Sequence, residues 1–201
     1  MSRKTETIPP QYFENKYRSD IDPWKFRTSD YEREKYAATI GALGRQRYAS
    51  ALEIGCSIGV LTALLAGRCD QVLAIDASAT AIAAARETVV KNATFQVGNL
   101  PQDFPAGKFS LIVLSEVLYY FVAADLARLA ALCVAALRPG GEIILCHWLG
   151  ETNYPLTGRA ASDLFAQAVA AILPSRALIR DDVYRLERFS EAWPEAAVAA
   201  G

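Results

Sequence analysis

The chain has 201 residues, 52% of them hydrophobic, and its 21 basic and 22 acidic residues leave a net charge of -1. This length suits one domain with a substantial core, and the interspersed charges give no reason to expect a nucleic acid or a membrane surface as partner. Charges interrupt every apolar stretch before it reaches the length of a membrane span, and the start, MSRKTETIPP, lacks the apolar core of a signal peptide. We expect a cytoplasmic protein.

The N-terminal part, from Gln11 to Gly44, has helical tendency with a break at Asp22-Pro23. Short apolar runs then alternate with stretches rich in alanine and leucine. The runs predicted as strands are Ala51–Ile54, Gln71–Ile75, Thr94–Val97, Leu111–Leu114 and Glu142–His147. The stretches predicted as helices are Leu61–Ala66, Thr80–Val90 and Ala124–Leu137, the last ended by the turn residues of LRPGG.

The predicted strands lack polar alternation, which is typical of strands covered on both faces. Alternating strands and helices predict an α/β fold, a doubly wound and mostly parallel sheet with helices on both faces. Near the end, Ala177–Arg180 and Tyr184–Phe189 flank Asp181-Asp182 and predict a terminal antiparallel pair, for seven strands in all. The tail, residues 195–201, is expected to fray.

Four cysteines, Cys56, Cys69, Cys133 and Cys146, show no CxxC spacing. We interpret them as small core residues of a reducing compartment and expect no metal site.

The stretch LEIGCSIGVLT, residues 52–62, places a glycine turn after the first strand, where open α/β sheets bind ligands. A dinucleotide fingerprint needs glycines at 55, 57 and 60, but Ser57 and Val60 stand at two of these positions. Glu53 also disfavours a diphosphate, because a buried carboxylate repels an anion. It favours a cationic or zwitterionic ligand, such as S-adenosylmethionine, which has no phosphate.

Five motifs in order resemble class I S-adenosylmethionine-dependent methyltransferases over roughly Ala51 to His147. They are Glu53–Gly59, Asp76, Gly98-Asn99-Leu100, Ser115-Glu116 and LRPGG. The resemblance implies a Rossmann-like fold, S-adenosyl-L-methionine as cofactor and S-adenosyl-L-homocysteine as product. Ser57 replaces the middle glycine of the family's turn, and it fits there if its φ is negative.

Asp22–Phe26, Thr28–Tyr36 and Glu116–Tyr120 resemble the NodS-type nodulation methyltransferases. That group methylates the free amine at the non-reducing end of a deacetylated chitooligosaccharide, in the synthesis of a lipochitooligosaccharide signal. The resemblance implies residues 1–44 as a helical lid, residues 45–201 as the methyltransferase domain, and an amine-bearing acceptor. No obligate protein partner is evident.

The cofactor residues follow from the matched motifs, each beside a structural alternative. Asp76 is expected to accept both ribose hydroxyls, or else to favour a helix N-terminus. Glu53 is expected to organise the loop at the methionine end, or else to pair with the N-terminal helices. Asn99 replaces the family's usual Asp at the adenine amino group, or is a turn residue. The other residues assigned to cofactor binding are Trp24, Arg33, Gly55, Cys56, Ser57, Gly59, Ala77, Leu100, Ser115 and Glu116.

Acceptor chemistry is assigned to residues after the fourth and fifth strands. An ammonium has no lone pair, so Glu116 is the first candidate to hold the amine and take its proton, with His147 second. Tyr119 joins them in the catalytic set, because tyrosines at the mouth offer sugar-stacking faces and hydroxyls. The alternatives are helix packing for the tyrosines, a structural role for the lone histidine and a core role for Trp24. A second loop-like region, Leu149–Leu164, is expected to shape an acceptor groove with Trp148 and Tyr154.

Rival functions remain open. A small-molecule N- or O-methyltransferase with a non-sugar acceptor and a non-catalytic S-adenosylmethionine-binding module both fit the motifs. A dehydrogenase is disfavoured by the missing glycine and by Glu53.

Overall fold

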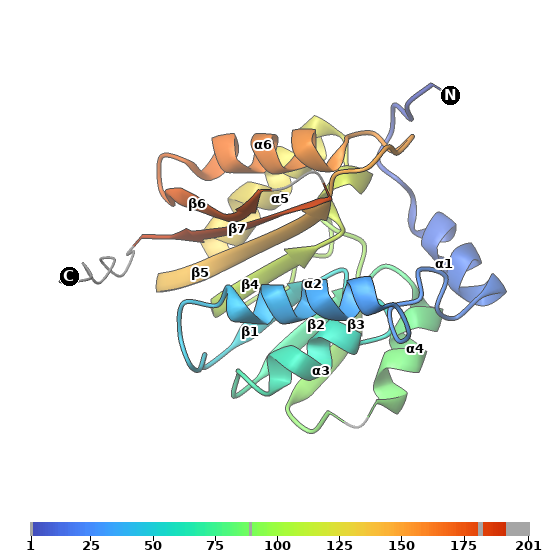
Figure 1. The fold of residues 1–201 in the computed structure, drawn as a ribbon, viewed down its shortest axis with the longest axis horizontal. Helices are drawn as coiled ribbons and strands as arrows, with labels where there is room; N and C mark the ends of the chain where they lie inside the picture. The colour runs from blue at the N-terminus through green and yellow to red at the C-terminus, as the bar shows by residue number, and fades with distance from the viewer. Residues whose placement is uncertain (1, 89, 181–182, 192–201) are drawn as a thin grey trace.

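The computed structural model describes residues 2–88, 90–180 and 183–191, so the tail expected to fray lies outside the described residues. One seven-stranded sheet has the order β3-β2-β1-β4-β5-β7-β6 (Figure 1). The strands are β1 (Ala51–Ile54), β2 (Val72–Asp76), β3 (Ala93–Val97), β4 (Phe109–Ser115), β5 (Leu137–Trp148), β6 (Ser175–Arg180) and β7 (Tyr184–Ser190).

The strand directions confirm the predicted sheet. β1 pairs in parallel with both β2 and β4, β3 joins β2 in parallel, and β5 joins β4 in parallel. β7 runs antiparallel to both β5 and β6, which makes the predicted terminal pair. The strand order reverses between β1 and β4, and this switch point is where open α/β sheets bind ligands.

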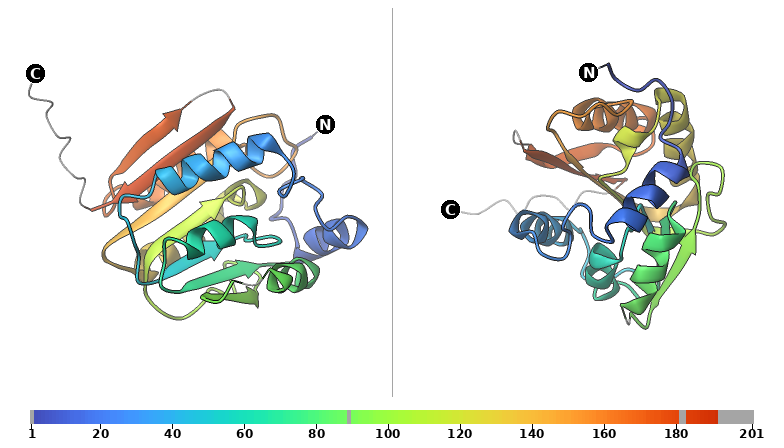
Figure 2. Two further views of the ribbon diagram at one scale, coloured as in Figure 1. Left: turned by 60° about the horizontal axis from the view of Figure 1, so that its bottom comes forward. Right: turned by 90° about the vertical axis from the view of Figure 1, so that its right-hand side faces the viewer.

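Helices cover both faces of the sheet, as predicted. They are α1 (Pro10–Ser19), α2 (Asp30–Gly41), α3 (Val60–Ala66), α4 (Ala79–Glu87), α5 (Ala123–Ala136) and α6 (Gly158–Val169), with a short 3-10 turn, η1 (Leu118–Tyr120). Helices α5 and α6 pack together on one face, and α2, α3 and α4 lie on the other. Helix α1 covers neither face and lies beside α4, as both views in Figure 2 show.

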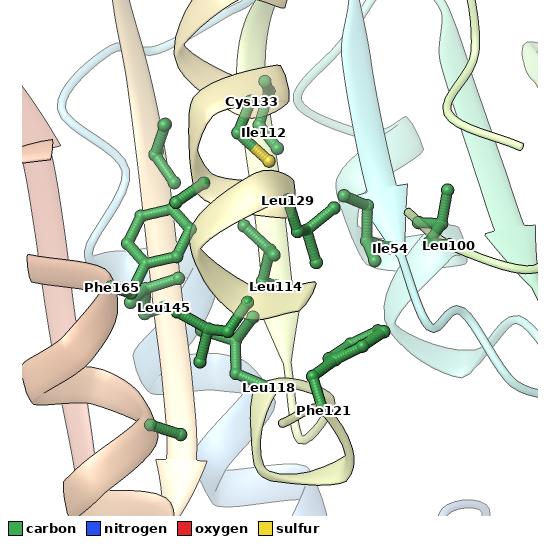
Figure 3. Close-up of a cluster of buried hydrophobic side chains, with 14 of the residues drawn as sticks. Ile54, Leu100, Ile112, Leu114, Leu118, Phe121, Leu129, Cys133, Leu145 and Phe165 are labelled. Carbon is green, nitrogen blue, oxygen red and sulfur yellow. The ribbon is translucent and has the colours of Figure 1, made fainter. Parts of the chain in front are cut away.

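The larger core cluster lies under α5 and α6 (Figure 3). Leu129 and Cys133 of α5 pack toward Ile112 and Leu114 of β4, and Phe165 of α6 completes the layer. All five side chains are fully buried. Burying such apolar side chains stabilises the fold by about 1.5–3 kcal/mol each, and it fixes the central strands whose ends carry the site.

Most predicted ends shift by one or two residues, and three differences are larger. Helix α4 ends at Glu87, short of Val90, and β5 begins at Leu137, because the LRPGG residues enter the strand through an irregular register with Gly140 at φ +69°. Helix α6 replaces the second half of the expected loop region. Its glycine, Gly158, marks a close approach rather than a loop, because a Cβ there would lie 1.9 Å from the Trp148 carbonyl oxygen.

Segments from both sides close over the carboxyl ends of the strands. The break before α2 occurs as predicted, and the Asp22 carboxylate accepts the backbone N–H groups of Phe26 and Arg27. Glu14 of α1 accepts hydrogen bonds from the hydroxyls of Ser78 and Thr80 at the start of α4. These bonds hold the Glu14 pKa down at about 2. Helix α1 is therefore fastened to the first turn of α4.

Candidate functional site

A cavity of about 770 Å³ lies at the carboxyl ends of β1, β2, β4 and β5, between α1 and α2. Its walls are largely aromatic and apolar, with carboxylates at its floor. The described residues that line it are Ile8, Phe13, Tyr17, Trp24, Phe26, Tyr31, Glu32, Lys35, Tyr36, Glu53, Ile54, Gly55, Cys56, Ser57, Leu61, Ile75, Asp76, Ala77, Gly98, Asn99, Leu100, Ser115, Glu116, Val117, Tyr119, Tyr120, Phe121, Trp148, Glu151, Thr152, Asn153 and Tyr154.

The glycine turn after β1 forms one wall of the cavity. Gly55 has φ +78°, and a Cβ there would press on the Val117 side chain at 3.2 Å. Ser57 has φ +52°, so it occupies the turn without meeting the condition of a negative φ under which a serine was expected to fit. Two contacts hold this left-handed serine: its N–H donates to Asp76 Oδ2 at 2.9 Å, and Tyr17 donates its hydroxyl hydrogen to Ser57 Oγ at 2.5 Å.

Asp76, at the end of β2, accepts hydrogen bonds on both carboxylate oxygens. Oδ2 accepts from the Ser57 N–H and Oδ1 from the Ser78 N–H, both at 2.9 Å. Burial raises the pKa of Asp76. No ion pair joins Asp76 to a basic side chain within the described residues. Each oxygen keeps a second lone pair, so the carboxylate can still accept two hydroxyls.

Glu53 lies on β1 and is 2% exposed. The Thr62 hydroxyl donates to its Oε2 at 2.5 Å, and burial raises the pKa of Glu53 to about 8, with the nearby Asp76 charge adding to the rise. The alternative of a salt bridge to the N-terminal helices does not occur among the described residues. Glu53 and Asp76 thus give this end of the cavity two buried acids without a basic side chain beside them.

Other expected cofactor residues line the same end: Trp24, Cys56, Ala77, Asn99, Leu100 and Ser115. Trp24 stacks on Phe26 with ring centroids 5.7 Å apart, next to Tyr17. The Ser115 hydroxyl oxygen is buried and has no hydrogen-bond partner within residues 2–88, 90–180 and 183–191. The loop after β3 is shaped by the Asn99 N–H, which donates to the Asp103 carboxylate at 2.9 Å.

Glu116 follows the last residue of β4 and lies at the other end of the cavity. Its φ is +57°. Its carboxylate accepts hydrogen bonds from Lys35 Nζ at 2.6 Å and from the Tyr119 hydroxyl at 2.8 Å. The Trp148 N–H donates to both of its oxygens, at 3.0 and 3.1 Å. These donors engage both carboxylate oxygens and hold the side chain in place. Glu116 is therefore less suited to the proton-accepting role that we expected of it.

Helix α2 brings residues to the cavity that the sequence did not lead us to assign: Tyr31, Glu32, Lys35 and Tyr36. Lys35 is 1% exposed and also donates to Glu32 Oε1 at 2.9 Å. The signal was present, because residues three and four apart share one helix face. On this helix the spacing groups an acid, a base and two aromatic rings.

Tyrosines form the wall near β4 and the segment after β5. Tyr119 stacks on Tyr154 with ring planes 8° apart, and Tyr120 packs edge-on against both rings. Tyr154 also shares a 3.0 Å hydrogen bond with the Tyr12 hydroxyl of α1. The Trp148 side chain is 38% exposed at the end of β5.

Three predicted site residues lie outside the cavity lining. His147 is fully buried, and its Nε2 accepts the N–H groups of Val117 and Leu118 at 3.4 and 3.1 Å, while burial lowers its pKa to about 4. It therefore supports the turn that carries Glu116 instead of handling a proton. Gly59 caps α3 at φ +81° against Ala85 and Phe95, and Arg33 pairs with Asp30 on the exposed side of α2.

Comparison with known proteins places this site in a family. The model of the family described as Nodulation protein S (NodS) matches residues 11–153. Nodulation protein S of Rhizobium tropici is 33% identical over 129 residues, covering 61% of this chain and 53% of that protein. The chain spans about half the length of the curated relatives it matches.

Solved structures show the same fold. A putative methyltransferase from Pseudomonas syringae is 38% identical with a TM-score of 0.67, covering 80% of this chain and 98% of that one. N-methyltransferase NodS from Bradyrhizobium japonicum WM9, in complex with S-adenosyl-L-homocysteine, has a TM-score of 0.74 at 23% identity, covering 90% and 96%. With its family match over most of its length, this chain belongs to the NodS family.

Proposed function

We propose that the protein is an S-adenosylmethionine-dependent N-methyltransferase that acts on the free amine of a deacetylated chitooligosaccharide. One observation carries the proposal. Glu53 on β1 and Asp76 at the end of β2 are both buried, and among the described residues neither has a basic partner. Buried charges are costly unless they are paired, so this end of the cavity suits a ligand that brings a positive charge and hydroxyls.

S-adenosylmethionine fits these two carboxylates, because it brings both hydroxyls and a positive charge. Asp76 would hold its ribose hydroxyls, Glu53 would face its cationic methionine end, and Asn99 and Leu100 would bind its adenine. The relatives support this assignment, because the NodS structure of Bradyrhizobium japonicum WM9 is that of an N-methyltransferase with S-adenosyl-L-homocysteine. We assign the Gly55, Cys56, Ser57 and Ala77 backbone to the same contact surface.

When bound, this cofactor supplies a methyl group on a sulfonium, whose departure is already favourable. The chain therefore needs chiefly to position the acceptor and exclude water. We assign the exclusion of water to residues 1–44 as a lid, with α1 fastened to α4 through Glu14 and to the glycine turn through Tyr17 and Ser57. Glu116, held by Lys35, and Tyr119 would shape the wall of the acceptor end.

The acceptor end suits an amine-bearing sugar. Tyr154 and Trp148 line the cavity with aromatic rings against which sugar rings can pack, and Tyr119 supports Tyr154 by stacking on it. Lys35 is the basic residue among the described residues that line the cavity, and its Nζ is engaged by two carboxylates. A phosphate or carboxylate on the acceptor would be repelled by the acids there. This favours an acceptor with an amine over an anionic acceptor.

A transfer assay tests the proposal. The protein is incubated with methyl-labelled S-adenosylmethionine and with chitotetraose that either carries a free terminal amine or is fully acetylated. Label is expected only in the free-amine compound. Label in neither, with S-adenosylhomocysteine still binding, would replace the proposal with another acceptor or a non-catalytic binding module.

No helix in the described ranges is long and apolar enough to cross a membrane. We propose that the protein works in the cytoplasm, where the cofactor is made.

A further inference from the structure

We propose that Glu32 of helix α2, together with the Tyr31 hydroxyl, binds the acceptor's amine, while Lys35 holds the Glu116 carboxylate in place as part of the cavity lining. This inference rests on the proposed N-methyltransferase function and names the residues that select its acceptor. It assigns to α2 the role that the sequence suggested for Glu116.

The two carboxylates around Lys35 differ in how fully they are engaged. Both oxygens of Glu116 accept hydrogen bonds, from Lys35, Tyr119 and the Trp148 N–H. Glu32 accepts from Lys35 through Oε1 alone, at 2.9 Å. A new donor such as an ammonium group would have to displace existing bonds at Glu116, whereas Glu32 has an oxygen in reserve.

The unused hydrogen-bonding capacity lies on α2. Glu32 Oε2 and the Tyr31 hydroxyl are buried and have no hydrogen-bond partner among the residues that the structure describes, and both residues line the cavity. Glu32 as a whole is 8% exposed. Buried polar atoms left without a partner cost free energy, so two such atoms on neighbouring cavity residues point to a ligand that supplies the missing bonds.

The charge of the cavity indicates which ligand. Five acidic residues and one basic residue line it among the described residues. A cofactor with one net positive charge would leave that balance negative, so a cationic acceptor remains favoured after the cofactor binds. Burial raises the pKa of Glu32 while Lys35 opposes the rise, and a second cation beside the carboxylate would stabilise its ionised form further.

The aromatic surroundings suit an ammonium as well. Lys35 Nζ already lies 4.9 Å from the centroid of the Tyr31 ring. A cation within about 6 Å of a ring centroid is attracted by the ring face. Tyr31 therefore contributes both a ring that tolerates cations and a hydroxyl with unused hydrogen-bonding capacity.

The experiment measures binding by calorimetry, with S-adenosylhomocysteine present and absent. The probes are chitotetraose with a free terminal amine and fully acetylated chitotetraose. The wild type is expected to prefer the amine. Glu32→Gln keeps the shape and the bond to Lys35 but loses the charge, so the preference is expected to fall by about tenfold or more. Tyr31→Phe is expected to weaken amine binding by a smaller factor.

Glu34→Gln is the matched control, because Glu34 lies on the same helix, is exposed and does not line the cavity. It should bind both probes as the wild type does, and S-adenosylhomocysteine should bind all variants within about twofold. Should Glu32→Gln not fold, Tyr31→Phe decides, because it removes only an unpartnered hydroxyl.

Two outcomes separate this inference from the proposed function. If the wild type transfers label to the amine and both α2 variants keep the full preference for it, the function stands and the role of α2 is overturned. If the wild type neither prefers nor methylates the amine, the proposed function fails, and the inference fails with it.

Discussion

The two ends of the cavity handle buried acids in opposite ways. At the end formed by β1 and β2, Glu53 and Asp76 have hydroxyl and N–H donors but form no ion pair with a basic side chain of the described part of the chain. At the end formed by β4, β5 and α2, Glu116 and Glu32 share the buried ammonium of Lys35. The first pair depends on a ligand for its positive charge, and the second carries one built into the chain.

This difference gives the two ends different roles: the first end sets the affinity for a charged ligand, and the second end sets the shape of the acceptor site. Acids without an internal cation gain most from a bound cation, so they favour tight binding of a charged ligand. Acids tied to Lys35 are stabilised before any ligand arrives, so they define the shape of the acceptor end. The ends should therefore respond differently to substitution, the first in cofactor affinity and the second in stability and in the preference for the acceptor.

The largest effect is expected from Lys35→Met, which removes the internal cation. Glu32 and Glu116 would then be buried together without a basic partner. Breaking a buried pair in this way costs about 3–5 kcal/mol, which corresponds to a fall in Tm of about 10 °C for a chain of this size. Thermal and urea unfolding measure it.

The control is Lys91→Met, at an exposed lysine, which should leave Tm unchanged. Adding Glu32→Gln and Glu116→Gln to Lys35→Met should restore part of the lost stability. A Lys35→Met protein as stable as the wild type would show that the acceptor end does not rely on its internal cation.

Asp76→Asn tests the other end through affinity. Asn has one acceptor oxygen and places an amide donor where Asp76 now accepts a backbone N–H. Affinity for S-adenosylhomocysteine is expected to fall by about a hundredfold, as charged hydrogen bonds are lost. Calorimetry measures it, with Asp70→Asn, at an exposed surface acid, as control. Equal affinity would remove Asp76 from the ligand contact.

The pH dependence of binding sharpens the same contrast at Glu53. Its pKa is about 8 in the folded protein against an ordinary 4.5. S-adenosylhomocysteine has no sulfonium, but its ammonium group favours the ionised Glu53 carboxylate, so its affinity should rise by up to about tenfold per pH unit as the pH approaches 8 and then level off. Stability without ligand should change in the opposite direction. The folded state binds more protons between pH 4.5 and 8, so stability falls as pH rises through that window.

Methylthioadenosine is the matched ligand for this test, because it keeps the adenine and ribose but lacks the amino acid. Its affinity should depend less on pH, and Glu53→Gln should remove the difference between the two ligands. Parallel pH profiles in the wild type would mean that Glu53 does not face the charged end of the ligand.

The sequence predicted the first end of the cavity well and the second poorly. Asp76 and Ser115 end their strands and Asn99 lies two residues after one, so a correct strand order places all three at one edge of the sheet. The α2 residues are distant in sequence from the residues they contact: Lys35 is 81 positions from Glu116. Helical spacing groups them on one face, but only packing against the sheet decides where that face points.

Other differences also arise from contacts distant in sequence. His147 ends a strand at the correct edge, yet its ring turns inward to the N–H groups of Val117 and Leu118. Gly158 is typical of a loop, whereas its lack of a side chain allows α6 to begin against the Trp148 carbonyl. Such neighbours are not visible in local composition.

The smallest expected effect concerns Ser57, whose positive φ was not predicted because tertiary contacts impose it. Ser57→Ala loses the hydrogen bond from Tyr17 and keeps the left-handed backbone, so a loss of about 1–2 kcal/mol is expected. Ser57→Gly loses the same bond but relieves a backbone cost of about 1–2 kcal/mol, so its stability should stay near that of the wild type. Urea unfolding of both variants isolates the backbone cost. Equal stability of the alanine and glycine proteins would show that the turn relaxes. The cavity wall at this end would then be less rigid than the wall at the other end, which the Glu116–Lys35 pair holds in place.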